Sequence, residues 1–424
     1  MKTEHEPTRE GDAGRLALLL ESRSPFLVVF VPLAAILLLT ANLSSHNHID
    51  PLTNSLTAWY VGMTGSVVMT EHEPAATPEQ YGNVAWIVNS PRGPIAQYPP
   101  GAAALAAPFY RLWGEDMTDW YVEGFNNPDA GAVPFPLPSP VPATVAAALA
   151  TAAALGLVAA AIPYAGGTRL NAVAAGYVGG LGTTMWATSS DALWQHGPAA
   201  LWIALGVYLA ARSRLLWSGL AFGAAIMTRP PIALMVAVAG IYLCIVRRSF
   251  RPGVLIGTGS VAGLGALLWY NWWVWGEVTL SGGYGTGISE NLLEPAPLSF
   301  VSNVVGAFVD PERGLLMYSP FLILLIPGLR EAWRRVPDWA RAAALGAAVY
   351  FVFQLKANRF SGGSGFIGYR YPLEPLTAAA VLLAMSYPMW IAGRQTAKRL
   401  FWIAVVISLV PTIYWKAVVV PVLG

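Results

Sequence analysis

Asp50 is the residue of this sequence best placed to do chemistry. It lies in the segment His46-Asn47-His48-Ile49-Asp50-Pro51, directly after the first long apolar run, residues 25–43. A carboxylate in that position can act as a general base that takes a proton from a hydroxyl group. It can equally be an acidic residue at the start of a helix, because Pro51 suits a first helical position. Position alone leaves both interpretations open.

Two groups of polar and aromatic residues could serve a substrate beside Asp50. Gln97 and Tyr98 precede Pro99-Pro100-Gly101, a rigid turn that can start a helix, and we expect both to face the same cavity as Asp50. Residues 189–197 join two apolar runs. The candidates for binding a sugar or an acceptor in these segments are Gln97, Tyr98, Asp191, Trp194, Gln195 and His196, together with His48. Alternatively, residues 97–101 are only a corner between a loop and a helix, and residues 189–197 are a polar hairpin that satisfies the backbone groups at helix ends.

Three arginines are candidates for binding a phosphate group. Arg229 stands next to Pro230-Pro231, while Arg359 and Arg370 flank a glycine-rich stretch that ends in Tyr369. Guanidinium groups form paired hydrogen bonds to phosphate oxygens, and backbone amides of a glycine-rich stretch can approach the same group. The alternative is that these arginines form salt bridges to Glu374, Asp310 or Glu312. Tyr369 is a further sugar or acceptor candidate.

Asn271 is the last candidate for the sugar or acceptor site. It lies within Trp269-Tyr270-Asn271-Trp272-Trp273-Val274-Trp275. Trp and Tyr commonly gather at the lipid headgroup level, so an aromatic belt is the ordinary interpretation of its neighbours. The amide side chain of Asn271 is less easily explained by such a belt.

Composition identifies a polytopic membrane protein. Of the 424 residues, 55% are hydrophobic and only 11% charged, and the mean hydropathy is +0.51, whereas soluble domains carry about 25% charged residues. A net charge of +2 gives no reason to expect a nucleic-acid partner. The single cysteine, Cys244, excludes a disulfide within one chain. No Walker loop, dinucleotide fingerprint or His-Glu-x-x-His motif occurs, so we expect a substrate that carries its own leaving group.

We predict an all-α polytopic membrane protein with about eleven transmembrane helices. The apolar runs are residues 25–43, 141–163, 171–188, 198–211, 215–229, 231–246, 253–275, 315–329, 342–356, 372–392 and 400–421. Most of the 25 Lys and Arg then fall on the side that also holds the N-terminus, as the positive-inside rule expects of cytoplasmic segments. The candidate site residues therefore belong to the outer side of a cell membrane.

This topology divides a single transmembrane domain, residues 1–424, into a cytoplasmic tail and three outer loops. The tail is 1–24 and the loops are 44–140, 276–314 and 356–371. Within the first loop, residues 52–69 and 102–113 predict interfacial helices, and 128–142 is rich in proline, as in an extended linker. No large polar segment follows the last apolar run, so no soluble C-terminal domain is expected.

Taken in order, these motifs resemble the GT-C superfamily of membrane glycosyltransferases that use sugars on polyprenyl phosphate. The resemblance rests on His48-Ile49-Asp50, Gln97 to Gly101, Asp191 to His196, Arg229-Pro230, Tyr270-Asn271, Arg313-Gly314 to Ser319-Pro320, and Gly362-Gly363-Ser364 to Tyr371. It implies an inverting transfer, of a mannose- or arabinofuranose-type sugar for example, to a glycan, lipid or protein acceptor at the outer face. Asp50 matches the family's base, and Arg370 and Arg229 would stabilise the leaving phosphate.

The chain departs from the family pattern at two points. Many relatives have a second carboxylate beside the first, where this chain has Pro51, and many carry a soluble C-terminal domain. The resemblance implies no required cofactor, although Asp50 with His46 or His48 offers ligands for a divalent ion. Two other functions fit the sequence. A transporter or flippase of a lipid-linked sugar needs a polar path across the membrane, and a non-catalytic assembly subunit would tolerate loss of charge at Asp50 and Arg370.

Overall fold

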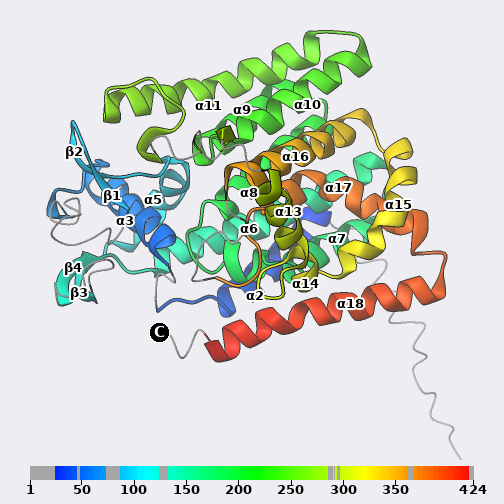
Figure 1. Ribbon diagram of the computed structural model, residues 1–424, viewed down its shortest axis with the longest axis horizontal. Coiled ribbons are helices and arrows are strands. Elements are labelled where there is room, and N and C mark those ends of the chain that lie inside the picture. Colours follow the sequence, from blue (N-terminus) through cyan, green and yellow to red (C-terminus); the bar gives the residue numbers. More distant parts are fainter. Residues whose placement is uncertain are drawn as a thin grey trace, which may run out of the picture.

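The computed structural model is a bundle of helices capped at one end by a small mixed layer (Figure 1). It describes residues 24–44, 48–72, 86–123, 132–284, 290, 292–293, 297–358, 360 and 366–419. The helices of the bundle are α2 (Pro25–Leu39), α6 (Val141–Ala161), α7 (Arg169–Leu181), α8 (His196–Ala211), α9 (Leu215–Thr228), α10 (Ile232–Arg247), α11 (Arg251–Trp275), α15 (Phe321–Arg335), α16 (Asp338–Ala357), α17 (Leu373–Trp390) and α18 (Gln395–Tyr414). Each of the eleven predicted apolar runs falls on one of these helices.

The short elements complete the description. They are the helices α3 (Ile49–Thr64), α5 (Gly101–Trp113), α13 (Pro297–Val309) and α14 (Leu315–Tyr318), the strands β1 (Ile87–Ser90), β2 (Gly93–Ala96), β3 (Thr118–Glu123) and β4 (Ala132–Leu137), and the single turns of 3-10 or π-helix η3 (Ile162–Ala165), η4 (Met185–Ser189), η5 (Gly282–Tyr284) and η6 (Trp415–Val419). The prediction of a helical membrane protein is confirmed, with these few strands added. Among the described residues, three helical stretches are long and apolar enough to cross a membrane: Val141–Ala165, Arg251–Trp275 and Gln395–Val419.

Helices far apart in sequence pack through small residues. The long helix α11 lies along α9, with Gly259 and Gly263 facing Gly219 and Gly223 so closely that a Cβ at any of the four would meet backbone of the other helix. Close approach of backbones through small residues is the usual way in which helices associate inside a membrane. Large apolar side chains are instead exposed along α11 and α18, where lipid would surround them.

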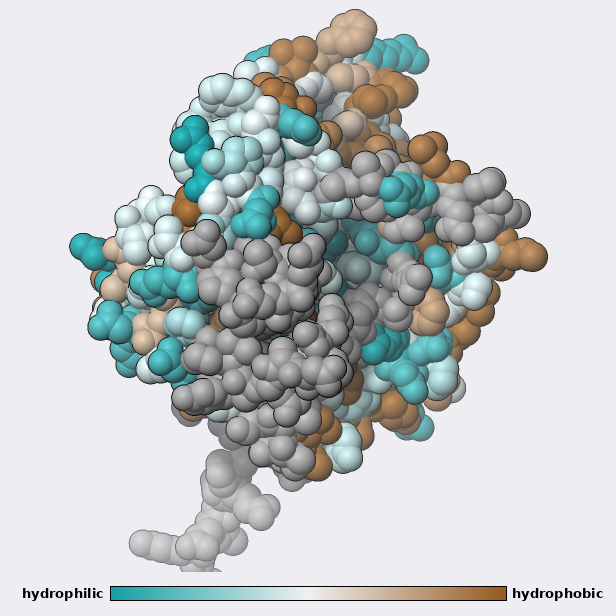
Figure 2. Space-filling model, turned by 60° about the vertical axis from the view of Figure 1, so that its left-hand side comes forward, coloured by the Kyte–Doolittle hydropathy of each residue, from teal (hydrophilic) through white to brown (hydrophobic). Residues whose placement is uncertain are grey.

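The capping layer is built from α3, α5 and the two hairpins, which lie together at the left of Figure 1. Its own core joins Trp59 and Tyr60 of α3 to Tyr110 of α5 and to Phe135 of β4. The two predicted helices of the first loop are confirmed as α3 and α5. The hairpins were not predicted: β1 pairs with β2 and β3 pairs with β4, both antiparallel. In Figure 2, with this end turned forward, hydrophilic residues gather over it.

His72 fastens the hairpin of β3 and β4 to α3. Its Nε2 lies 2.7 Å from the carbonyl oxygen of Pro136 and its Nδ1 lies 3.0 Å from the hydroxyl of Tyr60. Because a carbonyl can only accept, Nε2 carries the proton and Nδ1 accepts from the tyrosine. Burial lowers the pKa of His72 and keeps the ring neutral.

The Pro99-Pro100-Gly101 turn fixes the layer to the bundle. Pro100 is the N-cap of α5, and a Cβ on Gly101 would lie 2.5 Å from Oγ1 and 2.6 Å from the backbone of Thr228, the last residue of α9. Only glycine permits this approach. The turn therefore sets the distance between Tyr98, just before α5, and Arg229, just after α9.

We expect Gly101→Ala to destabilise the protein by about 1–3 kcal/mol, because the added methyl group must separate α5 from α9. Thermal unfolding of purified protein in detergent measures this effect. Gly265→Ala is the matched control, since a Cβ at that position of α11 meets nothing within 4 Å and alanine is the better helix former by roughly 0.5–1 kcal/mol. Equal unfolding temperatures for Gly101→Ala and the wild type would contradict the packing described.

Candidate active site

Asp50 lies in the first turn of α3, where two side chains bind its carboxylate and a third binds its backbone amide. His48 is the N-cap of α3, and its Nδ1 accepts a hydrogen bond from the backbone amide of Asp50. The hydroxyl of Tyr98 donates to Oδ1 at 2.5 Å, and Nη1 of Arg370 donates to Oδ2 at 2.8 Å. The side chain remains 18% exposed. Asp50 therefore starts a helix and also faces a site, so the two sequence interpretations are compatible.

The charge of Asp50 is strongly stabilised. Burial raises the pKa of its carboxyl, but the positive charge of Arg370 and hydrogen bonds from Tyr98 and Arg370 outweigh burial and hold that pKa well below its usual range. Burial and the neighbouring carboxylate raise the pKa of Tyr98 well above its ordinary value, so its phenol keeps the proton that it donates. Asp50 is thus an ionised carboxylate that already accepts hydrogen bonds from Tyr98 and Arg370.

Arg370 is enclosed by aromatic rings. Its guanidinium carbon lies 4.4 Å from the ring centroid of Trp194, 4.8 Å from that of Phe366 and 5.4 Å from that of Tyr371. Cations are attracted to such faces, more strongly where water is excluded. Nε of Arg370 has no hydrogen-bond partner within the described part of the chain. One edge of the guanidinium binds Asp50, and its buried Nε–H is left unsatisfied by the described residues.

A second arginine also contacts the ring of Tyr371. Nη1 of Arg229 lies 3.1 Å from Oε1 of Glu374, and the same oxygen accepts from Nδ1 of His196 at 2.8 Å. The guanidinium carbon of Arg229 is 5.6 Å from the Tyr371 ring centroid. Glu374 is fully buried in the first turn of α17. The ring of Tyr371 therefore contacts both arginines, each of which is already paired with a carboxylate.

Aromatic side chains complete the wall of the site. The ring of His48 stacks on Trp194 with centroids 5.4 Å apart and planes at 20°. Tyr284 packs against Tyr98 at 5.6 Å. Tyr369 is fully buried against Tyr371, and its hydroxyl forms no hydrogen bond with any residue that the structure describes. Flat aromatic faces beside a carboxylate are suited to a sugar ring, which has apolar C–H faces and polar edges.

The structure brings most of the predicted site residues together, but not all of them. Asp50, His48, Tyr98, Trp194 and Arg370 form one cluster, and Arg229 and His196 join it through Tyr371. Gln195 directly precedes His196 as the N-cap of α8. The backbone of Gln97 packs against Gly283. Arg359, like His46, lies outside the described residues.

Asp191 and Asn271 have other partners. Oδ1 of Asp191 is 2.6 Å from Nζ of Lys416 and accepts from the backbone amide of Asn42 at 2.9 Å, so it ties the end of α18 to the residues after α2. The amide of Asn271 donates to the carbonyl of Thr279 at 2.6 Å and holds the turn that follows α11. Both side chains thus take part in contacts that hold segments of the fold together, and their assignment to a sugar or an acceptor stays a prediction.

Sequence reasoning missed the importance of Glu374, Tyr371 and Phe366. Glu374 entered only as one of several carboxylates that an arginine might bind, and its partner is Arg229. The sequence held a signal for Glu374, because a glutamate at the start of an apolar run needs a cation nearby to balance its charge. Within the described residues, no group of three or more His, Cys, Asp or Glu is arranged to hold a metal ion.

Comparison with known proteins shows the fold. No protein-family model matches the chain, and no curated protein matches it in sequence. Among solved structures, the chain is similar to ArnT from Cupriavidus metallidurans bound to undecaprenyl phosphate, with a TM-score of 0.57 and 17% identity. The alignment covers 90% of this chain and 63% of ArnT. The chain therefore shares the helical membrane fold of ArnT over most of its own length and under two thirds of that protein.

We expect Glu374→Gln to destabilise the protein by about 3–5 kcal/mol, because the change leaves the buried charge of Arg229 without its counter-ion. The unfolding temperature in detergent measures the loss. The matched control is Glu331→Gln in α15, which removes an exposed pair with Arg335 that is worth under about 1 kcal/mol. Similar unfolding temperatures for the two variants would show that Glu374 does not balance Arg229.

Proposed function

We propose that this protein is an inverting membrane glycosyltransferase that takes its sugar from a polyprenyl-phosphate donor. The observation that carries the proposal is the direct contact between Asp50, a general base candidate, and Arg370, a phosphate-binding candidate. The fold supports it, because ArnT shares the fold and its structure holds undecaprenyl phosphate. The order of motifs that resembles the GT-C superfamily agrees with the same reaction.

The reaction needs a base for the acceptor hydroxyl and a cation for the leaving phosphate. Asp50 takes the proton of an acceptor hydroxyl, whose oxygen forms a bond to the anomeric carbon. The bond from that carbon to the phosphate oxygen breaks at the same time, so the configuration inverts and polyprenyl phosphate leaves. The leaving phosphate gains negative charge, and fixed cations stabilise that charge. Arg370 and Arg229 are the cations that we assign to it.

Donor binding would also prepare the base. In the structure Arg370 neutralises Asp50 and keeps its pKa low, which makes the carboxylate a weak base. A phosphate bound by Arg370 competes for the same guanidinium, and its negative charge acts on Asp50 directly. Both effects raise the pKa of the carboxyl toward the range in which proton transfer is efficient. The base therefore becomes effective only when the donor is in place.

The remaining assignments follow the positions of the side chains. Tyr98 holds one oxygen of Asp50 and leaves the other to Arg370, so the pair keeps its orientation. We assign the partly exposed ring of Tyr371 to the sugar, and the acceptor to the partly exposed edge of Asp50, while the buried ring of Trp194 positions His48 and Arg370. The site lies at the capped end of the bundle, which we propose faces the outer side of the cell membrane. We propose that no metal is required.

Asp50→Asn should lower the rate of sugar transfer by about 10²–10⁴-fold, the usual contribution of a general base. The assay is transfer of radiolabelled sugar from polyprenyl-phosphate donors by purified protein, with a chelator present throughout. Asp116→Asn is the control, since Asp116 is exposed on the capping layer and should behave like the wild type. Undiminished transfer by Asp50→Asn would refute the assigned base, and lipid movement without any product would favour the transporter.

Arg370→Gln should shift the pH dependence of kcat/KM. The wild-type carboxylate stays ionised to low pH because Arg370 lowers its pKa. Without that cation, burial raises the pKa of Asp50, so activity falls at a higher pH as the solution is acidified. The KM for donor should also rise about 10–100-fold, as expected for a charge-assisted hydrogen bond worth about 1.5–3 kcal/mol.

Arg370→Lys is the matched variant for this test. It keeps the positive charge, so the acid limb of the profile should stay near that of the wild type, while the paired geometry of a guanidinium is lost and KM still rises. Superimposable pH profiles for the wild type and Arg370→Gln would show that Arg370 does not control the ionisation of Asp50.

A further inference from the structure

A buried lysine lies near the end of the last helix, outside the cluster of Asp50 and Arg370. Lys416 belongs to η6, which continues α18, and its side chain is only 9% exposed. The nearby side chains of Tyr414 and Val418 are 58% and 45% exposed, as on a helix that faces lipid. A lysine at such a place ordinarily extends its amine toward the headgroups. Here the amine turns into the bundle, and an ionisable group in that position calls for a functional explanation.

The amine of Lys416 binds the segment that joins η4 to α8. Its Nζ donates to Oδ1 of Asp191 at 2.6 Å and to the carbonyl oxygen of Thr40 at 2.8 Å. The same Oδ1 accepts from the backbone amide of Asn42 at 2.9 Å, and Asp191 is fully buried. The contact therefore joins the end of α18 to the residues after α2 and to residues 191–194, which we refer to as the 191–194 segment.

The 191–194 segment ends in the ring that places Arg370. Trp194 is buried, and its ring stacks on His48 and lies with its centroid 4.4 Å from the guanidinium carbon of Arg370. The backbone between Asp191 and this ring is tight, since the amide of Trp194 donates to the carbonyl of Ala192 at 2.8 Å. A displacement of Asp191 is therefore passed on to the ring of Trp194.

The segment has a second anchor in the helix of the candidate base. The carbonyl oxygen of Leu193 accepts from the side-chain amide of Asn54 in α3 at 3.0 Å. This contact fixes the segment to α3, while Asp191 fixes it to α18 and to the residues after α2. Without the anchor on α18 the segment can tilt about the one on α3. The contact with Lys416 therefore sets the tilt of the Trp194 ring.

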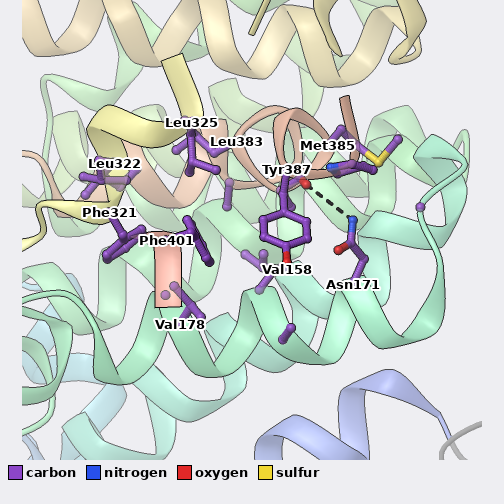
Figure 3. Close-up of a pocket in the computed structure, with 18 of the residues that line it drawn as sticks. Val158, Asn171, Val178, Phe321, Leu322, Leu325, Leu383, Met385, Tyr387 and Phe401 are labelled. Atoms are coloured by element: carbon purple, nitrogen blue, oxygen red, sulfur yellow. Dashed lines mark hydrogen bonds between the residues drawn. The ribbon is translucent and has the colours of Figure 1, made fainter. Parts of the chain in front are cut away.

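The apolar contacts of α18 do not supply this alignment. Nearer its start, Phe401 of α18 turns toward the same apolar space as Phe321 and Leu325 of α15 (Figure 3). The attraction between apolar groups is non-directional, so such contacts hold the helix against the bundle without fixing its rotation. A charge-assisted hydrogen bond is short and needs an aligned donor and acceptor.

A buried ion pair is a costly way to attach a helix. Two apolar residues of similar size are often as stable or more so, because desolvation of the charges offsets their attraction. The ion pair supplies instead one defined geometry. Both chain segments that meet here also carry a turn of π-helix, η4 before Asp191 and η6 at Lys416, and such turns are frequent at functional sites. These observations favour alignment, rather than stability, as the role of the pair.

We propose that Lys416 is a positioning residue for sugar transfer. Through Asp191 it aligns Trp194, and Trp194 aligns the guanidinium of Arg370 for the donor phosphate and the ring of His48 at the start of α3. Lys416 itself touches no reacting group. This inference rests on the proposed function and adds to it a residue of the last helix.

A charge-balanced pair of substitutions separates alignment from stability. Lys416→Met alone would bury the charge of Asp191 without that of the lysine and so destabilise the fold. Lys416→Met/Asp191→Asn removes both charges, keeps both side chains near their original size and leaves at position 191 an oxygen that can accept from Asn42. The control is Arg399→Met, which removes a positive charge from an exposed position near the start of α18. Unfolding temperature, kcat and KM for the donor are measured for each purified protein.

The double variant should unfold near the temperature of the wild type, while its kcat/KM for the donor falls about 10–100-fold, because a misplacement of about 1 Å can cost on the order of 100-fold. Part of the loss should be a higher KM, since Arg370 meets the phosphate out of alignment. A loss of folded protein alone would lower kcat and leave KM unchanged. Arg399→Met should match the wild type. Wild-type constants for the double variant, or a lower kcat with unchanged KM, would overturn the proposal.

Fluorine NMR of the Trp194 ring tests the alignment without any sugar transfer. Protein grown with fluorotryptophan gives signals from its indole rings, and Trp194→Phe identifies the signal of Trp194. That signal should move in the double variant, because the ring changes its position relative to the charge of Arg370, and should stay in place in Arg399→Met. If the wild type transfers no sugar but the signal moves, the proposed function fails and alignment of Trp194 by Lys416 stands. A signal that does not move would refute the inference, whatever the rate of transfer.

Discussion

The ion pair between Asp50 and Arg370 is the contact on which the rest of the site depends. It joins residues 320 positions apart, one at the start of α3 and the other just before α17. Two charges taken out of water are stable only when their geometry and hydrogen bonds are well satisfied. The turn at Gly101, the N-cap at His48 and the aromatic rings around Arg370 all serve that requirement, because each fixes one of the segments that must meet.

The second pair, Arg229 with Glu374, makes the site electrically balanced before any substrate arrives. The ring of Tyr371 contacts both guanidinium groups. A site with two unpaired buried cations would be unstable, whereas one with two carboxylates can release an arginine toward a phosphate at the moment of binding. In the reaction that we propose, binding of the donor phosphate would free the carboxylate of Asp50, so one exchange of partners would couple donor recognition to formation of the base.

The sequence allowed the helices to be predicted better than the contacts. Long apolar runs are a local property, and every predicted run falls on a helix. The strand β4 was read as a linker because its prolines hide the alternation of a strand, and the helix expected to reach residue 188 ends at Leu181, where a glycine-rich stretch gives way to the turn η4. Asp50 was found because a charge directly after an apolar run demands a reason, Tyr98 because it precedes the Pro99-Pro100-Gly101 turn, and Arg370 because it flanks a glycine-rich stretch. The pairs of Glu374 and Asp191 could not be assigned, because the partner of a buried charge is decided by the fold and lies far away in sequence.

The position of α18 also depends on a buried charge that needs a partner. Lys416 reaches Asp191 and the carbonyl of Thr40, so the end of α18 is fixed by polar contacts to segments beside the site. Nearer its start, Phe401 packs against Phe321 of α15. Phe401 also packs against Tyr387 of α17, with ring centroids 5.0 Å apart, so α18 contacts both helices near its start and is otherwise largely exposed. A lysine outside the cluster of Asp50 and Arg370 thereby fixes where α18 lies against the bundle.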